Sequence, residues 1–262
     1  MNADFSITNG QYKDSKFRKD AFSADLQLGA SYLEQWGVNF RAGTSTFAFN
    51  NKSDSIEQNE YGVRFFKNIY SDSASGVITL ILGKYWINGD KIDPTTVYNP
   101  ELTFLNHSKS LLLGLGYANS KYGENRNTAL FVNQYSATLG FKLLFNNLWM
   151  NIKGMLINYG NNPFYSAQPT LSWLITNKNR LYPSTLSFGG LLGKRSYAVE
   201  QERMLTYNIS DVQQYSYFTS VLWHLSDNRY FSISAGSETL KDSTSNTNYQ
   251  YNYINGGLSI IW

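Results

Sequence analysis

The feature that most limits how this chain can fold is a regular alternation of apolar and polar residues. The apolar set of Phe22–Tyr32 is Phe22, Ala24, Leu26, Leu28, Ala30 and Tyr32, and the same pattern recurs in Tyr135–Phe145 and Tyr165–Ile175. Successive side chains of a β-strand point to opposite faces, and a tilted strand of about ten residues crosses a bilayer. The alternation therefore predicts membrane-crossing strands with one apolar and one polar face.

Weaker copies of the pattern fill most of the remaining chain. They are Trp36–Phe47, Gln58–Ile69, Gly76–Ile87, Lys109–Asn119, Leu148–Asn158, Tyr182–Gly193, Gln214–Leu225, Arg229–Lys241 and Tyr249–Trp262. Asp4–Gln11 and Thr96–Leu105 are poorly patterned but complete the series. We expect an all-β fold, a closed antiparallel transmembrane β-barrel of about 14 strands within a range of roughly 12 to 16. It would form one domain over residues 1–262.

The predicted connections fall into a short class and a long class. The short ones are Leu33–Gln35, Asn146–Asn147, Asn177–Arg180 and Ser226–Asn228, and the long polar ones are Asn50–Glu57, Ser120–Thr128, Lys194–Ser210 and Asp242–Asn248. Short periplasmic turns and longer extracellular loops are typical of outer-membrane barrels. Lys194–Ser210 is long enough to fold into the pore or to meet a partner, and the sequence leaves both roles open.

Composition excludes several other classes of protein. The chain has 20 Tyr, 16 Phe and 6 Trp, only 5 Pro and no Cys, so it can hold no disulfide, thiolate metal site or Cys nucleophile. No run approaches the roughly 18 apolar residues of a spanning helix. A dispersed net charge of +3 does not indicate nucleic-acid binding. Met1–Asp4 lacks the basic and apolar regions of a signal peptide, so we expect an export signal to have been removed.

The Trp residues give an independent indication of a membrane boundary. Trp36, Trp149, Trp173, Trp223 and Trp262 all lie near a predicted short turn or the chain end, whereas Trp86 lies toward the opposite rim. Indole rings prefer the headgroup level of a bilayer. The five therefore indicate a periplasmic aromatic girdle. The alternative, aromatic residues filling the core of a soluble sandwich, does not explain this grouping.

The last predicted strand resembles the C-terminal signature of Gram-negative outer-membrane β-barrel proteins, the porin-like superfamily. Trp262 is a terminal aromatic residue, preceded at alternate positions by Ile260, Leu258 and Ile254, with Gly256 as a gap. The usual last residue of that superfamily is Phe. The resemblance implies a closed barrel in the bacterial outer membrane, in contact with lipid and lipopolysaccharide, and inserted by the machinery that reads the final strand.

The polar set of each strand is expected to line the interior. Its ionisable members are Asp25, Arg41, Glu60, Arg64, Lys142, Lys153 and Glu238. In one interpretation Asp25, Arg41, Glu60 and Arg64 form a salt-bridged ladder in the wall. In the other, Arg41, Arg64, Lys142 and Lys153 form a basic track for an anionic solute such as an acidic sugar. The mixed signs do not indicate strong ion selectivity.

Candidate catalytic chemistry is sparse. His107 and His224 are the two histidines, and both are expected near the periplasmic rim, with His107 in a turn and His224 on the lumen face. The His-x-Ser spacing of outer-membrane phospholipases is absent, and no base can be placed beside a nucleophile. No phosphate-binding Gly loop or calcium loop is present. We therefore expect no catalytic residue, no metal and no cofactor.

Four functions remain open after this reading. The first is a channel for small hydrophilic solutes, oligosaccharides included. The second is an export pore that resembles the C-terminal barrels attached to helical-repeat scaffolds in exopolysaccharide secretion. The third is an outer-membrane lipase or deacylase, and the fourth is a structural or adhesive barrel.

Overall fold

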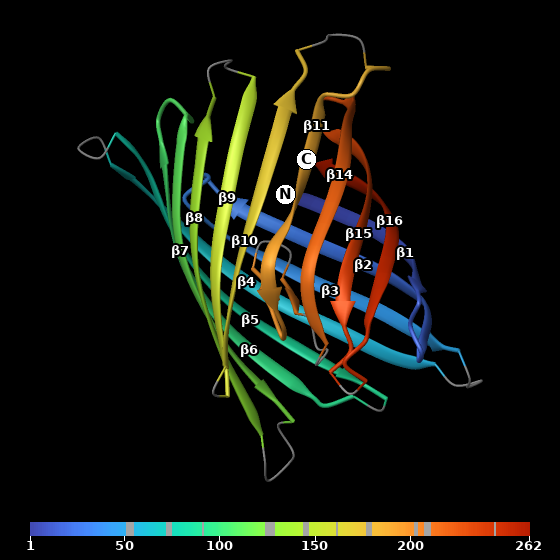
Figure 1. The fold of residues 1–262 in the computed structure, drawn as a ribbon. Coiled ribbons are helices and arrows are strands. Elements are labelled where there is room, and N and C mark those ends of the chain that lie inside the picture. Colours follow the sequence, from blue (N-terminus) through green and yellow to red (C-terminus); the bar gives the residue numbers. More distant parts are fainter. Residues whose placement is uncertain are drawn as a thin grey trace.

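The computed structural model shows a single closed barrel of 14 antiparallel strands (Figure 1). It describes residues 1–262 except 51–54, 72–74, 91, 124–128, 144–146, 161, 177–179, 202–203, 207–210 and 244. The wall strands are β1 (Asn2–Lys13), β2 (Arg18–Tyr32), β3 (Trp36–Phe49), β4 (Ile56–Ser71), β5 (Gly76–Gly89), β6 (Thr95–Asn106), β7 (Leu111–Tyr122), β8 (Leu130–Lys142), β9 (Leu148–Tyr159), β10 (Asn162–Leu174), β11 (Thr185–Arg195), β14 (Val212–Ser226), β15 (Arg229–Lys241) and β16 (Asn248–Ile261). The predicted fold class and strand number are confirmed.

The barrel closes where the first strand meets the last. β1 pairs with β16 over its full length, in a register that sets Phe5 opposite Leu258. The Met1 ammonium donates to the Trp262 carbonyl at 2.8 Å. Closure matters because an unpaired edge would leave backbone N–H and C=O groups without partners in lipid.

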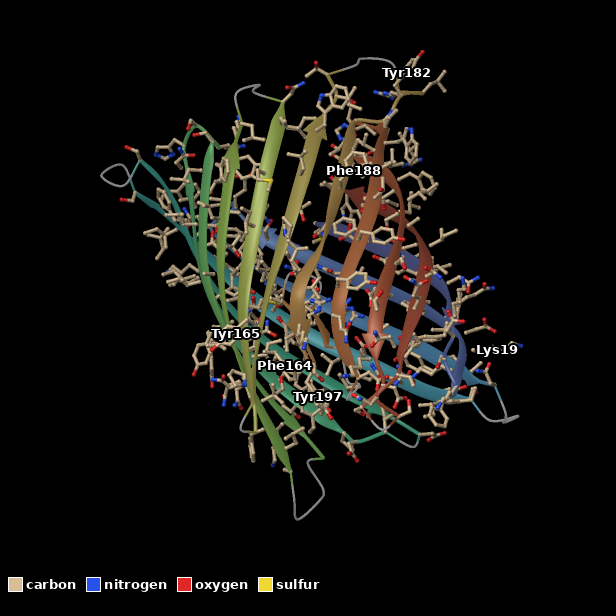
Figure 2. The ribbon with its side chains drawn as sticks, in the orientation of Figure 1. Lys19, Phe164, Tyr165, Tyr182, Phe188 and Tyr197 are labelled. Atoms are coloured by element: carbon tan, nitrogen blue, oxygen red, sulfur yellow. The ribbon has the colours of Figure 1, made fainter. Side chains whose placement is uncertain are left out.

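The outer surface of the barrel is apolar, as the alternation predicts. Leu26 and Leu139 are 43% and 41% exposed, while their polar neighbours Gln27 and Thr138 face inward. Figure 2 shows the same division along β10 and β11, where Tyr165 and Phe188 project away from the barrel. In the described residues no helix is long and apolar enough to cross a membrane.

The two rims are less different than the sequence suggests. Leu33–Gln35 and the turn between β14 and β15 are short and lie on the rim that holds both termini. The same rim, however, carries the longer connection 175–184, because β10 ends at Leu174 and β11 begins only at Thr185. At the opposite rim β9 and β10 are joined through residues 160–161 alone. The predicted turns at Asn146 and 177–179 lie outside the described residues.

Strand ends differ most from the prediction at β8. The sequence suggested Tyr135–Phe145, whereas the strand is Leu130–Lys142. The alternation fails before Tyr135 because Asn133 occupies an outward position, where its Oδ1 accepts hydrogen bonds from Tyr117 at 2.7 Å and Asn119 at 2.8 Å. Paired polar groups of this kind allow the strand to continue beyond the apolar band.

The outward assignment gives a direct prediction. We expect Leu26→Arg and Leu139→Arg each to lower the free energy of unfolding in liposomes by about 2–4 kcal/mol, because an Arg side chain near the bilayer centre is poorly solvated. Gln27→Arg and Thr138→Arg, the adjacent inward positions, are the matched controls and should cost much less. Urea titration provides the measurement, and equal losses on both faces would contradict the assignment.

Candidate channel interior

A short hairpin lies inside the barrel. It is formed by β12 (Val199–Glu200) and β13 (Leu205–Thr206), between β11 and β14, and Figure 1 shows it within the ring of strands. Val199 and Met204 are each 1% exposed. They pack against Tyr85, Val97 and Ala118, inward side chains of β5, β6 and β7. Of the two roles left open for Lys194–Ser210, folding into the pore is the one that the structure shows.

A second apolar contact holds the segment that leads into the hairpin. Ala198 is buried with Tyr122, Val132 and Ile157, which come from β7, β8 and β9. Leu130, Phe164 and Tyr197 pack against the edge of this cluster. The inner faces of β5–β9 thus share an apolar patch, and the hairpin segment covers it.

Polar contacts fix the height of the hairpin in the barrel. The Gln134 amide donates to the Val199 carbonyl and accepts from its N–H, both at 2.9 Å. Ser136 donates to Gln201 Oε1 at 2.9 Å, and Gln168 donates to Glu200 at 3.1 Å. Because these partners lie well inside β8 and β10, the hairpin reaches into the barrel rather than capping its mouth.

Three predicted interior residues form one charged cluster on β2, β3 and β4. Arg41 is 7% exposed and pairs with Glu60 at 2.5 Å and with Asp25 through its other terminal nitrogen. The same guanidinium donates to the Met204 carbonyl at 2.8 Å. The cluster therefore joins the polar wall to the hairpin. Arg64 lies apart from it and pairs with Glu101 at 3.6 Å.

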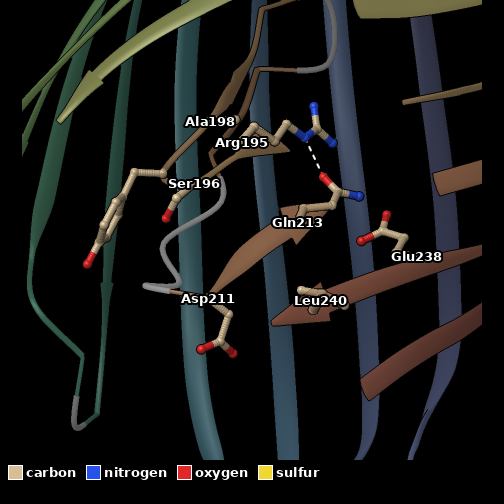
Figure 3. Close-up of a pocket in the computed structure, with 8 residues that line it drawn as sticks. Arg195, Ser196, Ala198, Asp211, Gln213, Glu238 and Leu240 are labelled. Carbon is tan, nitrogen blue, oxygen red and sulfur yellow. Dashed lines mark hydrogen bonds between the residues drawn. The ribbon is translucent and has the colours of Figure 1, made fainter. Parts of the chain in front are cut away.

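The other predicted interior residues lie farther round the wall. Lys142 and Lys153 lie on the inner face of β8 and β9, where Lys153 is opposite Gln168. Glu238 lies on β15 and lines a small pocket with Arg195, Asp211 and the start of the hairpin segment (Figure 3). Arg195 donates to Gln213 in that pocket and pairs with Glu200 at 2.6 Å.

Four of the five predicted girdle residues project outward. Trp36, Trp173 and Trp262 are 55%, 49% and 62% exposed, and Trp223 shares their outward face. Trp149 does not fit the girdle, because it lies opposite the inward Lys142. Its ring fills the space above Gly140, where an added Cβ would lie 2.7 Å from the indole. Trp149 is close to a turn, but it has the same parity on β9 as the inward Met155 and Ile157, so it points into the barrel and not into the girdle.

Sequence reasoning also missed the apolar inner wall. On β5, Ile81, Tyr85 and Ile87 face inward while Leu80 and Leu82 face outward, so both faces of the strand are apolar. Such a strand signals a packed interior rather than a uniformly polar one. A strand that is apolar on both faces was therefore the pattern in the sequence that could have indicated an element inserted into the barrel.

The histidines lie at the rim that holds the termini. His107 is in the turn between β6 and β7, and the His224 ring meets the Tyr230 ring edge-on with centroids 4.6 Å apart. Among the described residues no group of three or more His, Cys, Asp or Glu side chains could hold a metal ion.

The double role of Arg41 can be tested by substitution. Arg41→Leu leaves Asp25 and Glu60 without their shared cation, and we expect it to lower the free energy of unfolding by about 3 kcal/mol. It also removes the donor to Met204, so the ion current through single barrels should fluctuate more. Arg64→Leu is the control, because Arg64 makes no hydrogen bond to the described part of the hairpin; equal current noise in both variants would contradict the anchoring role.

Comparison with known proteins supports the architecture. No family model and no curated protein sequence matches the chain. Among solved structures it is similar to the TodX deltaS2S3 mutant monoaromatic hydrocarbon channel, with TM-score 0.57, 10% identity and coverage of 98% of this chain and 88% of that one. It is also similar to a bacterial polysaccharide outer membrane secretin, with TM-score 0.53, 10% identity and coverage of 99% and 98%.

A third similar structure is the outer membrane protein Omp33 of Acinetobacter baumannii, with TM-score 0.50, 9% identity and coverage of 99% of this chain and 97% of that one. At these identities the likeness is one of fold. The chain has the fold of bacterial outer-membrane β-barrels, as its final strand and its alternation predict.

Proposed function

We propose that this protein is a passive outer-membrane channel for small hydrophilic solutes, oligosaccharides included. The observation that carries the proposal is the division of the interior into two walls. The hairpin covers the apolar patch of β5–β9, whereas the wall from β15 through β16 to β3 carries polar groups. Its inward side chains include Asp4, Ser6, Thr8, Asp25, Gln27, Asn39, Glu238 and Asn255. A wall of this kind favours a hydrated path.

Charge placement supports weak rather than strong ion selectivity. Two members of the suggested basic track, Arg41 and Arg64, have carboxylate partners in the wall. Lys142 and Lys153 have no ion-pair partner among the described residues and remain as candidates for contact with an anionic solute. Opposite charges side by side leave little net field along the path.

Transport is favoured over hydrolysis. Both histidines lie at the rim of the termini, and neither imidazole ring hydrogen-bonds a serine hydroxyl within the described part of the chain. A nucleophilic mechanism needs a base within reach of the attacking oxygen. Unchanged lipase or deacylase activity in a His107→Ala and His224→Ala double variant, if any activity is detected, would exclude these residues as its source.

Polysaccharide export is the second candidate function. It is favoured by the similarity to the polysaccharide secretin, which spans nearly the whole of both chains. Helical repeats upstream in the full gene would support export, and a signal peptide immediately upstream would contradict it. In either function we propose contact with outer-membrane lipid and lipopolysaccharide around the barrel, and recognition of β16 by the insertion machinery.

The channel proposal predicts a measurable current. We expect the refolded protein to give steady single-channel conductance in a planar bilayer. Replacing residues 197–206 by a short Gly-Ser linker should raise that conductance severalfold, because the hairpin no longer narrows the interior.

The control for this experiment is replacement of residues 242–247 by a Gly-Ser linker, because this connection lies at the same rim as the one that carries the hairpin but is not part of it. It should leave the conductance unchanged. Heat-modifiable gel mobility verifies that each variant is folded. Absence of current from folded protein, with and without the hairpin, would overturn the channel proposal.

A further inference from the structure

Four tyrosines form a continuous aromatic strip on the inner wall. Tyr12 of β1 lies 4.7 Å from Tyr251 and 5.9 Å from Tyr249, measured between ring centroids. Tyr251 in turn stacks on Tyr253 at 5.8 Å. We call Tyr12, Tyr249, Tyr251 and Tyr253 the tyrosine ladder.

The ladder faces the lumen and lies along the wall. Tyr251 is opposite Tyr12 and Glu238, and Tyr253 is opposite Gly10 and Gly236. A Cβ added at Gly10 would lie 2.3 Å from the Tyr251 ring, and one added at Gly236 would lie 2.6 Å from the Tyr253 ring. The glycines therefore make room for rings that lie across neighbouring strands instead of projecting into the middle of the barrel.

The ladder occupies the half of the barrel that faces the hairpin. In the closed strand order β16 lies seven places from β7, the middle of the wall on which the hairpin packs. The rings begin at Tyr249, one residue into β16, and reach Tyr253. Toward the terminal rim the inward positions of β16 change to Asn255, Gly257 and Ser259. The aromatic strip thus occupies the part of β16 farthest from the termini, and small polar residues follow it toward the terminal rim.

Charged groups flank the rings. The Arg18 guanidinium lies 5.7 Å from the Tyr12 ring and 5.8 Å from the Tyr249 ring, and it pairs with Asp211 at 2.8 Å. Tyr249 donates to Asp211 and is 3% exposed, so it anchors the end of the ladder that is farthest from the termini. Tyr12, Tyr251 and Tyr253 are half-buried on the inner face of the wall.

The chemistry of this strip matches a sugar ring better than an ion or a hydrocarbon. A pyranose has an apolar C–H face, which an aromatic face attracts, and hydroxyl edges that need polar partners. The ladder supplies the faces, and Glu238, Arg18 and the tyrosine hydroxyls supply partners at the sides. A purely apolar solute would displace water from beside these polar groups without offering hydrogen bonds in its place, which disfavours it.

We propose that the tyrosine ladder is a binding track for linear neutral oligosaccharides in the extracellular half of the channel, with Tyr12, Tyr251 and Tyr253 stacking on successive sugar rings. The proposal rests on the proposed channel function and names its substrate class. It differs from the basic track suggested by the sequence, because its contacts are aromatic and its solute is uncharged.

The first test is block of the single-channel current by maltohexaose. We expect concentration-dependent block of the unaltered protein, and a roughly tenfold weaker block constant in the Tyr251→Leu and Tyr253→Leu double variant, equivalent to about 1.4 kcal/mol. Leucine keeps bulk over Gly10 and Gly236 but removes the ring faces. The double Phe variant should retain the block. Tyr215→Leu with Tyr217→Leu, on the outer face of β14, is the matched control and should behave like the unaltered protein.

A second measurement separates failure of the ladder from failure of the channel. Calorimetric titration of maltohexaose into the detergent-solubilised barrel needs no current. Binding that the inner Leu pair abolishes and the outer Leu pair retains supports the ladder, even if no conductance is seen. Equal binding in the inner and outer pairs, or no binding to the unaltered protein, overturns it. Polyethylene glycol of similar radius should block all variants alike, because it has no ring to stack.

Discussion

The constraint on which the rest of this structure depends is that lipid offers no hydrogen bonds. Every backbone group of a membrane-crossing strand must find its partner on a neighbouring strand, so the sheet has to return on itself. Here β1 completes the ladder of β16, and the two ends of the chain meet at Met1 and Trp262. Closure fixes an inner and an outer face for each wall strand, and the alternation in the sequence follows from it.

Closure also creates an interior that something must fill. A wall that is polar throughout can be left to water, but the inner faces of β5–β9 carry the apolar patch around Tyr85 and Ile157, and hydrating it would be unfavourable. The hairpin shields this apolar surface from water by packing Val199 and Met204 against it. Its own polar edges meet Gln134 of β8 and Arg41 of β3. The side of the interior under the hairpin is thereby a packed core, and the opposite side carries polar groups and the tyrosine ladder.

The sequence was sufficient for the parts of the structure that repeat. Strand number, facing and the inward charges follow from period-two alternation, which the bilayer enforces at each crossing. The sequence was insufficient where the orientation of a side chain depends on a partner that is distant in the chain. The inward Trp149, the apolar inner face around Tyr85 and the meeting of Arg41 with Met204 all depend on contacts between distant strands. The tyrosine ladder was hidden for the same reason, since Tyr12 and Tyr251 become neighbours only on closure.

The amide pair between Gln134 and Val199 bears on how the protein assembles, because it joins residues 65 positions apart. The hairpin has no surface on which to fold until β5 to β9 stand side by side, and its contacts with Arg41 require β3 as well. Its docking is therefore a late event that waits for the sheet.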